Sequence, residues 1–301
     1  MAEAPTPRLV LVTGASAGIG AAVARELARQ GFDLALTARR ADRLSKLADE
    51  IRDDVSQRNG RVPKVDNFTA DLDDPKTPET LIADVVGRCG RLDVLVNNAG
   101  FGLPALFSES DPAEIRRQLE VNFVAPLMLA RFAMPHLLSS KGMIINVGSS
   151  ITSVPNSALG AYGATKAGLA YWNDAIRREL KHRGVRVCLV EPGPVKTEFF
   201  SALEKLAPPG HAYNPMLDAP APWMSAKVDD VARRIVRLID RPKRRLSVLK
   251  RVVWPFRMIG GLFQICPPLG DLALSTMAQH FDRKGDLSRV KRSQGDARPT
   301  E

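Results

Sequence analysis

The chain has 301 residues, a length that allows one large α/β domain with an appendage. Hydrophobic residues make up 45% of it and charged residues 25%, an ordinary globular balance that excludes a chain disordered throughout. The three cysteines form no CxxC pair, which argues against a disulfide framework and against a zinc site. The cysteine pattern predicts a protein without a metal. The amino-terminal residues lack the pattern of a secretory signal, so we expect a cytoplasmic protein.

The net charge of +10 is concentrated near the carboxyl end of the chain. Residues 241–292 hold 12 Lys and Arg but only 3 Asp and Glu. A nucleic-acid-binding domain usually carries its basic stripe on the main folded unit. The distribution of charge therefore indicates that no nucleic acid is a partner.

Strands and helices alternate along the first 250 residues. Apolar runs and amphipathic stretches predict, in chain order, strand 9–13, helix 19–30, strand 34–37, helix 42–57, strand 62–68, helix 77–88, strand 92–96, helix 112–138, strand 143–147, helix 161–182, strand 185–190, helix 228–240 and strand 245–249. Parallel strands need crossover connections, and this alternation supplies them. The sequence therefore predicts a doubly wound parallel α/β sheet, the Rossmann fold, as a single domain over residues 8–250.

Three segments depart from the alternation. Residues 192–225 carry seven prolines, and a loop of this length is typical of a lid over a site. The large apolar side chains of the expected lid are Phe199, Phe200, Leu203, Leu206, Tyr213, Met216, Leu217 and Trp223. They suit a hydrophobic ketone, aldehyde or alcohol better than a sugar. Residues 251–283 form a basic, apolar extension, and the polar tail 284–301 is expected to be disordered.

A glycine-rich turn, TGASAGIG over residues 13–20, joins the first strand to the first helix. It places Gly14, Gly18 and Gly20 where backbone N–H groups can approach a pyrophosphate, with Ser16 and Ile19 between them. An ordinary tight turn would use the same residue types. The strand before it and the helix after it favour a dinucleotide site instead.

The end of the second strand bears on which dinucleotide is bound. An NAD site would offer a carboxylate there to the ribose 2′-hydroxyl, whereas this chain has Arg39 and Arg40. Guanidinium groups fork around phosphate, so the pair favours NADP(H) over NAD, unless both arginines are merely solvated at the start of a helix. Asp71 and Leu72, just past the third strand, are placed to bind the adenine edge.

Tyr162 and Lys166 lie four residues apart in an expected helix and therefore share one of its faces. A phenol is a poor acid or base at neutral pH, and a nearby ammonium group favours its ionised form. The pair is a candidate for proton transfer to a carbonyl. Taken alone, the same pair is more often a plain contact on a helix surface.

Six separated motifs resemble, in order and spacing, those of short-chain dehydrogenases/reductases. They are TGASAGIG at 13–20, NNAG at 97–100, Asn122 within VNF, Ser149 thirteen residues before Tyr162, YGATK at 162–166 and PGPVKT at 192–197. The resemblance covers residues 8 to about 250. It implies an NADP(H)-dependent oxidoreductase that interconverts a hydrophobic ketone or aldehyde and its alcohol by hydride transfer.

The resemblance also implies catalytic roles. Tyr162 is the general acid/base, and Lys166 lowers the pKa of Tyr162 and holds the hydroxyls of the nicotinamide ribose. Ser149 hydrogen-bonds the substrate oxygen and stabilises its developing charge. Asn122 holds a water that links Lys166 to solvent, unless it is a capping or structural residue.

Two loops complete the implied cofactor site. Its remaining residues are Asn98, Ala99, Gly100, Pro192, Gly193, Val195 and Thr197. Ser150 and Ser153 are rivals of Ser149 that lack the family spacing to the tyrosine. Ala17 occupies the place where some relatives carry a basic residue, so the expected preference for NADP(H) rests on Arg39, with Arg40 supporting. Family members commonly pair through the helices that hold the catalytic asparagine and tyrosine, which implies a homodimer or homotetramer.

The extension leaves two expectations open. Residues 250–263 alternate cations with apolar and aromatic side chains, and the longest uncharged stretch, 258–270, has 13 residues, too few for a membrane-spanning helix. The segment either lies on anionic lipid, which would make the protein membrane-associated, or packs as a flap on the substrate site or a neighbouring subunit. Two alternative functions stay open as well. One is a membrane-associated reductase of lipid intermediates, such as a 3-oxoacyl or sphingoid ketone, and the other is a catalytically idle dinucleotide-binding partner or sensor.

Overall fold

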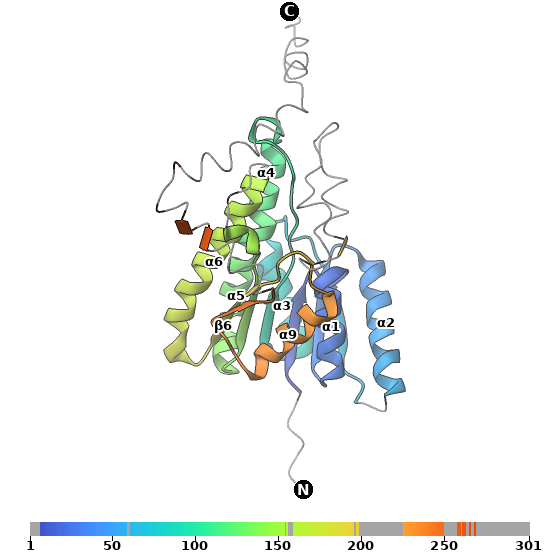
Figure 1. Ribbon diagram of the computed structural model, residues 1–301. Coiled ribbons are helices and arrows are strands. Elements are labelled where there is room, and N and C mark those ends of the chain that lie inside the picture. The colour runs from blue at the N-terminus through green and yellow to red at the C-terminus, as the bar shows by residue number, and fades with distance from the viewer. Residues whose placement is uncertain are drawn as a thin grey trace, which may run out of the picture.

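Figure 1 shows the computed structural model of the chain. The structure describes residues 7–58, 61–153, 155, 159–195, 197–198 and 225–249, together with residues 258, 259, 261, 262, 265 and 268. The expected lid side chains, most of the carboxyl-terminal extension and the tail lie outside the described residues.

The described strands form one parallel sheet of seven strands in the order β3-β2-β1-β4-β5-β6-β7. They are β1 (Leu9–Thr13), β2 (Asp33–Ala38), β3 (Val65–Thr69), β4 (Val94–Asn97), β5 (Met143–Val147), β6 (Arg186–Glu191) and β7 (Arg245–Ser247). The chain runs outward from β1 through β2 to β3 and then returns to β4 on the other side of β1. The predicted doubly wound sheet is confirmed, and its switch point, where such folds bind ligands, lies between β1 and β4.

Helices cover both faces of the sheet (Figure 1). On one face lie α1 (Gly18–Arg29), α2 (Ala41–Gln57) and α9 (Val228–Asp240), and on the other lie α3 (Thr77–Cys89), α5 (Ala125–Ser139) and α6 (Gly160–Leu180). A further helix, α4 (Pro112–Leu119), precedes α5. Each face therefore has its own apolar core, with the sheet between them.

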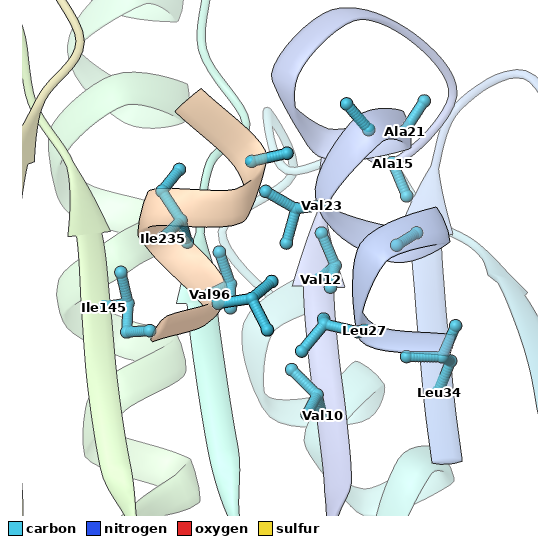
Figure 2. Packing of buried hydrophobic residues seen from close by; sticks show 14 of the residues in the cluster. Val10, Val12, Ala15, Ala21, Val23, Leu27, Leu34, Val96, Ile145 and Ile235 are labelled. Atoms are coloured by element: carbon cyan, nitrogen blue, oxygen red, sulfur yellow. The ribbon is translucent and has the colours of Figure 1, made fainter. Parts of the chain in front are cut away.

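The alternation of side chains along β1 divides these two cores. Val10 and Val12 pack against α1 and α9, where Figure 2 shows them beside Leu27, with Ile235 over the neighbouring Val96 and Ile145, whereas Leu9 and Leu11 belong to the core on the opposite face. A strand buried on both faces needs apolar residues in both alternating sets, and β1 has them. The carboxyl ends of the central strands are thereby held on a rigid layer.

Some element boundaries differ from those predicted. The third strand begins at Val65 and not at residue 62, because Pro63 has no N–H to donate to a ladder. The last strand ends at Ser247, two residues early. The expected helix 112–138 is divided by a π-helical turn, η2 (Glu120–Val124), and the expected helix 161–182 becomes a 3₁₀ turn, η5 (Lys181–Arg183), after Leu180. The π turn matters most, because it contains Asn122.

One helical run in the described part of the chain, Pro112–Ser139, is long and apolar enough to cross a membrane by length and composition alone. Within it, Leu129, Ala133 and Leu137 are fully buried in the core beneath the sheet. A core helix of a doubly wound fold has this composition, and the packing accounts for the apolarity of the run.

Candidate active site

The glycine turn after β1 leaves space only for backbone. Gly14 and Gly18 have φ of 66° and 57°, a region that favours glycine. A Cβ atom on Gly14 would lie 2.8 Å from the Cα of Ala99, and one on Gly20 would lie 2.4 Å from the carbonyl oxygen of Gly14. Ala17, the N-cap residue of α1, has no side-chain oxygen with which to bind the first-turn amides. These features fit a backbone cradle for the pyrophosphate of a dinucleotide.

Thr13 and Asn98 join the ends of β1 and β4 at the switch point. The backbone N–H groups of Asn98 and Ala99 both donate to Thr13 Oγ1 at 3.0 Å. Asn98 Nδ2 donates to the carbonyl oxygen of Thr13 at 2.9 Å and to that of Gly14 at 3.3 Å. The NNAG loop therefore holds the carboxyl ends of β1 and β4 together, and Thr13 is a partner to which the sequence assigned no role.

Cationic side chains gather where β2 ends. Arg40, the N-cap residue of α2, donates to Ser16 Oγ from Nη2 at 3.0 Å and from Nε at 3.3 Å. Arg39 Nη1 lies 3.8 Å from Asp71 Oδ2, and both side chains are exposed. The side chain of Leu72 is buried in the core, so it contributes packing. Both arginines thus stand beside the expected ribose position, with Arg40 nearer the glycine turn.

Two further charged residues at this position were not among the predicted site residues. Arg43 Nη1 donates to both carboxylate oxygens of Glu198, at 2.7 and 2.8 Å, and Arg40 Nη1 donates to Glu198 Oε2 at 3.3 Å. Helical spacing from Arg40 to Arg43 is a sequence signal that could have found the first. Glu198 lies 155 residues from Arg43 in the chain, and no local pattern connects them.

The catalytic candidates converge at the carboxyl ends of β4 and β5. Tyr162 and Lys166 project from α6 and are 8% and 4% exposed. Lys166 Nζ donates to the carbonyl oxygen of Val147 at 3.0 Å and lies 6.0 Å from the centroid of the Tyr162 ring. The Tyr162 hydroxyl is hydrogen-bonded to the side chain of Ser149. The structure therefore brings the phenol, the serine hydroxyl and the amine together, with the phenol and the amine buried and Ser149 half-buried.

Burial dominates the electrostatics of this group. It raises the pKa of the Tyr162 phenol from 10.0 to about 12, although the hydrogen bond with Ser149 acts in the lowering direction. It also lowers the pKa of the Lys166 amine from 10.5 to about 8. In the chain without cofactor, burial therefore has a larger effect on the pKa of Tyr162 than the hydrogen bond with Ser149, and the phenol keeps its proton at neutral pH. That Lys166 lowers the pKa of Tyr162 remains a prediction.

Asn122 ties the π turn to the loop after β4. Its Oδ1 accepts from the N–H of Phe101 at 3.0 Å, and its Nδ2 donates to the carbonyl oxygen of Phe101 at 2.8 Å and to Thr165 Oγ1 at 3.3 Å. A Cβ atom on Gly100 would lie 3.0 Å from Asn122 Oδ1 and 3.3 Å from Lys166 Nζ. The side-chain amide thus packs the loop against the catalytic lysine. That Asn122 also holds a water remains a prediction.

The segment after β6 lies over the glycine turn. Gly193 has a φ of 71°, and Val195 is buried and forms a parallel bridge with Ala226. A Cβ atom on Gly18 would lie 3.3 Å from the Cβ of Thr197, so Thr197 packs directly against the glycine turn. Pro192 belongs to the same segment, and that the segment binds the cofactor remains a prediction. Over the residues described, no three His, Cys, Asp or Glu side chains are grouped so that they could hold a metal ion.

Comparisons with known proteins agree with this geometry. The family model described as short chain dehydrogenase matches residues 8–206. The chain is 31% identical to the uncharacterized oxidoreductase YbbO of Escherichia coli, over 85% of this chain and 93% of that one. It is also 31% identical to an 11-beta-hydroxysteroid dehydrogenase-like protein of Arabidopsis thaliana, over 89% and 80%. A short-chain dehydrogenase from Sphingobium yanoikuyae in complex with NADPH is 30% identical and superimposes with a TM-score of 0.70, over 85% and 94%.

Proposed function

The chain belongs to the short-chain dehydrogenase family and is an oxidoreductase acting on a CH–OH group, and on that basis we propose that it reduces hydrophobic ketones or aldehydes with NADP(H) as cofactor. The observation that carries the proposal is the group formed by Ser149 and the buried Tyr162 and Lys166 beside a glycine cradle at the switch point of the sheet. The reverse oxidation uses the same groups.

The protein's part in the reaction is to position the substrate and to supply a proton. When bound, the cofactor supplies the hydride. The hydroxyls of Ser149 and Tyr162 are hydrogen-bonded to each other and together can receive a carbonyl oxygen. Tyr162 donates its proton as negative charge develops on that oxygen, and Ser149 stabilises the charge by a hydrogen bond. Lys166 then lies within one turn of the phenol, where its ammonium form favours the phenolate that remains.

The choice of NADP(H) is supported by charge. The backbone turn after β2 offers Arg39 and Arg40 where an NAD-binding site would offer a carboxylate. Arg40 reaches across to Ser16 in the glycine turn, so a guanidinium spans the place where the ribose 2′-phosphate belongs. The solved relative from Sphingobium yanoikuyae holds NADPH.

The alternative of a reductase of lipid intermediates at a membrane is favoured by one observation. Four residues of the extension, Met258, Ile259, Leu262 and Ile265, expose apolar side chains, from 43% for Ile259 to 85% for Ile265. The corresponding proposal is that the protein is located in the cytoplasm and binds the membrane surface through the extension. Liposome flotation of the full chain and of a truncation after Leu249 tests it, and equal flotation of the two would dismiss it.

A homodimer or homotetramer is also proposed. Family resemblance places the subunit contact on the helices that hold Asn122 and Tyr162. Tyr171 on α6 is 82% exposed and Leu119 at the end of α4 is 38% exposed, which supplies apolar area for such a contact. Sedimentation equilibrium tests the assembly, and a monomer at micromolar concentration would refute it.

The proposed activity is tested by following NADPH and NADH oxidation spectrophotometrically with aliphatic, aromatic, steroidal and acyl ketones and aldehydes. We expect turnover with a hydrophobic carbonyl and faster turnover with NADPH than with NADH. Binding of NADPH without turnover of any carbonyl or alcohol would favour the idle dinucleotide-binding protein instead.

A further inference from the structure

A carboxylate already occupies the most cationic position of the proposed cofactor site. We use the name guanidinium notch for Arg40, Arg43 and the hydroxyl of Ser16. Glu198 lies in it, with both carboxylate oxygens within 2.8 Å of Arg43 Nη1 and Oε2 at 3.3 Å from Arg40 Nη1. The two guanidinium groups hold the pKa of Glu198 below its usual value.

The position of the notch relates it to the adenosine ribose. Ser16 belongs to the turn between β1 and α1, and Arg40 and Arg43 to the start of α2, directly after β2. In doubly wound folds the ribose of a dinucleotide lies between these two turns, and its 2′ substituent points to the residues after the second strand. Arg40 bridges the two turns through its hydrogen bonds with Ser16. A 2′-phosphate and the Glu198 carboxylate would therefore meet the same donors.

The contact with Glu198 is a reversible one. Its side chain is 57% exposed, and those of Arg40 and Arg43 are 44% and 41% exposed, so each group can be solvated when it loses its partner. Exposed ion pairs of this kind contribute little net free energy. A phosphate, with more charge and three acceptor oxygens, can displace a single carboxylate from guanidinium groups. Glu198 follows Thr197, which faces Gly18, so it belongs to the segment over the cofactor position.

We propose that Arg43 is a second anion-binding residue of the 2′-phosphate site and that Glu198 is a built-in competitor for that site. The inference rests on the proposed NADP(H) function. NADPH must displace the carboxylate from the notch, whereas NADH has no 2′-phosphate and leaves the ion pair in place. Glu198 therefore narrows the preference for NADP(H) over NAD(H), and Arg43 widens it.

The test measures binding of two nucleotide fragments to the full chain by isothermal titration calorimetry, without any turnover. Adenosine 2′,5′-bisphosphate carries the 2′-phosphate, and 5′-AMP lacks it. We expect Glu198→Gln to bind the bisphosphate about 3-fold more tightly, a change typical of one exposed ion pair, and to bind 5′-AMP unchanged. We expect Arg43→Gln to bind the bisphosphate at least about 3-fold more weakly.

The double variant Arg43→Gln with Glu198→Gln distinguishes two effects of Glu198. One is competition with the 2′-phosphate for Arg43, and the other is the general repulsion of an anion by a nearby negative charge. When Arg43 is already replaced by Gln, Glu198→Gln should raise the affinity for the bisphosphate by less than it does in the wild type. The reason is that the Glu198 carboxylate no longer competes for Arg43, its main partner. Asp54→Asn is the matched control, since Asp54 is also a carboxylate paired with two arginines, Arg29 and Arg58, although its side chain is 32% exposed and that of Glu198 57%. It lies 11 residues along α2 from Arg43, about 16 Å at 1.5 Å per residue, which is beyond the screening length at physiological salt. Asp54→Asn should bind both fragments as the wild type does.

Three results would overturn the inference. The first is that Glu198→Gln binds the bisphosphate no more tightly than the wild type. The second is that Asp54→Asn raises the affinity for the bisphosphate as much as Glu198→Gln does. The third is that Arg43→Gln binds the bisphosphate as tightly as the wild type. The proposed cofactor choice fails separately, if the wild type itself binds the bisphosphate no more tightly than 5′-AMP.

Discussion

Two regions along the carboxyl edge of the sheet, one beside β2 and one beside β5, hold charged side chains in opposite environments. Beside β2, the side chains of Arg39, Arg40 and Arg43 are 58%, 44% and 41% exposed. Beside β5, Tyr162 and Lys166 are 8% and 4% exposed. The first group exchanges partners in water, where a single ion pair contributes little. The second is desolvated, which raises the pKa of Tyr162 to about 12 and lowers the pKa of Lys166 to about 8.

This difference divides the functions of the two regions. Exposed cations can select between NADP(H) and NAD(H) at small cost to folding, because each remains solvated in every state. Buried titratable groups can carry proton transfer, but they cost stability in the absence of cofactor. Substitutions at the catalytic end should therefore change rate and stability by large amounts, and substitutions beside β2 should change cofactor preference by small ones.

The largest effect is expected for Tyr162→Phe. Loss of the proton donor should lower kcat about 10²- to 10⁴-fold, whereas NADPH binding should stay close to that of the wild type, because the ring is kept. Initial rates and fluorescence titration of NADPH measure the two quantities. A loss of binding as large as the loss of rate would contradict the assignment of the hydroxyl to proton transfer.

The next effect concerns the glycine cradle. Gly14→Ala should lower the free energy of unfolding by about 2–4 kcal/mol, because the new Cβ meets the backbone of Ala99 at 2.8 Å in a conformation with positive φ. Gly31→Ala is the matched control, since Gly31 also has positive φ but nothing within 4 Å of its Cβ position, and it should cost about 1 kcal/mol. Urea unfolding measures the free energy of unfolding of both variants. Equal decreases would mean that the short distance between the Gly14 Cβ position and Ala99 is not the reason why this position needs glycine.

Lys166→Met should stabilise the cofactor-free chain while it abolishes turnover. Below pH 8 the folded chain holds a buried ammonium, and between pH 8 and 10.5 the folded lysine is neutral while the unfolded one still binds a proton. The burial of the Lys166 ammonium therefore lowers the free energy of unfolding by its full amount below pH 8, and this loss disappears as the pH rises to 10.5. At pH 7 the methionine should gain about 1–3 kcal/mol, after allowance for the lost hydrogen bond to Val147.

Urea unfolding of the wild type and of Lys166→Met at pH 7 and pH 10 measures this dependence. The gain should be largely lost at pH 10, because the folded lysine is then neutral and most of the interval between its folded and unfolded pKa values has been crossed. Loss of stability as the raised pKa of Tyr162 is approached affects both chains alike and cancels. A gain that does not depend on pH would indicate better packing by methionine and not relief of a buried charge.

The smallest effect is expected beside β2. Arg39→Asp should shift the ratio of kcat/KM for NADPH to that for NADH about 10-fold toward NADH, since a carboxylate repels the 2′-phosphate and accepts a ribose hydroxyl. Arg25→Asp makes the same change on α1, at an arginine that is 38% exposed against 58% for Arg39, and should leave the ratio unchanged. If both variants keep the wild-type ratio, the phosphate is held by other groups, and Arg40 and Arg43 are the nearest.

The sequence alone predicted most of what is local. A helix places residues four apart on one face, so the spacing of Tyr162 and Lys166 already placed their side chains on the same side of the helix. The turn around Gly14 could be recognised because only glycine tolerates its backbone conformation. The alternation of apolar runs predicted the doubly wound sheet, and the main errors were strand ends and the π turn at Asn122.

Tertiary structure decided what depends on distant parts of the chain. Glu198 reaches Arg43 only because the sheet brings the segment after β6 next to the start of α2, and Asn122 meets Phe101 across a loop and a π turn. The direction in which the pKa values of Tyr162 and Lys166 move follows from burial, which spacing does not reveal. Helical spacing and backbone conformation are set by neighbouring residues, whereas desolvation and long-range ion pairs exist only after the crossovers have assembled the sheet.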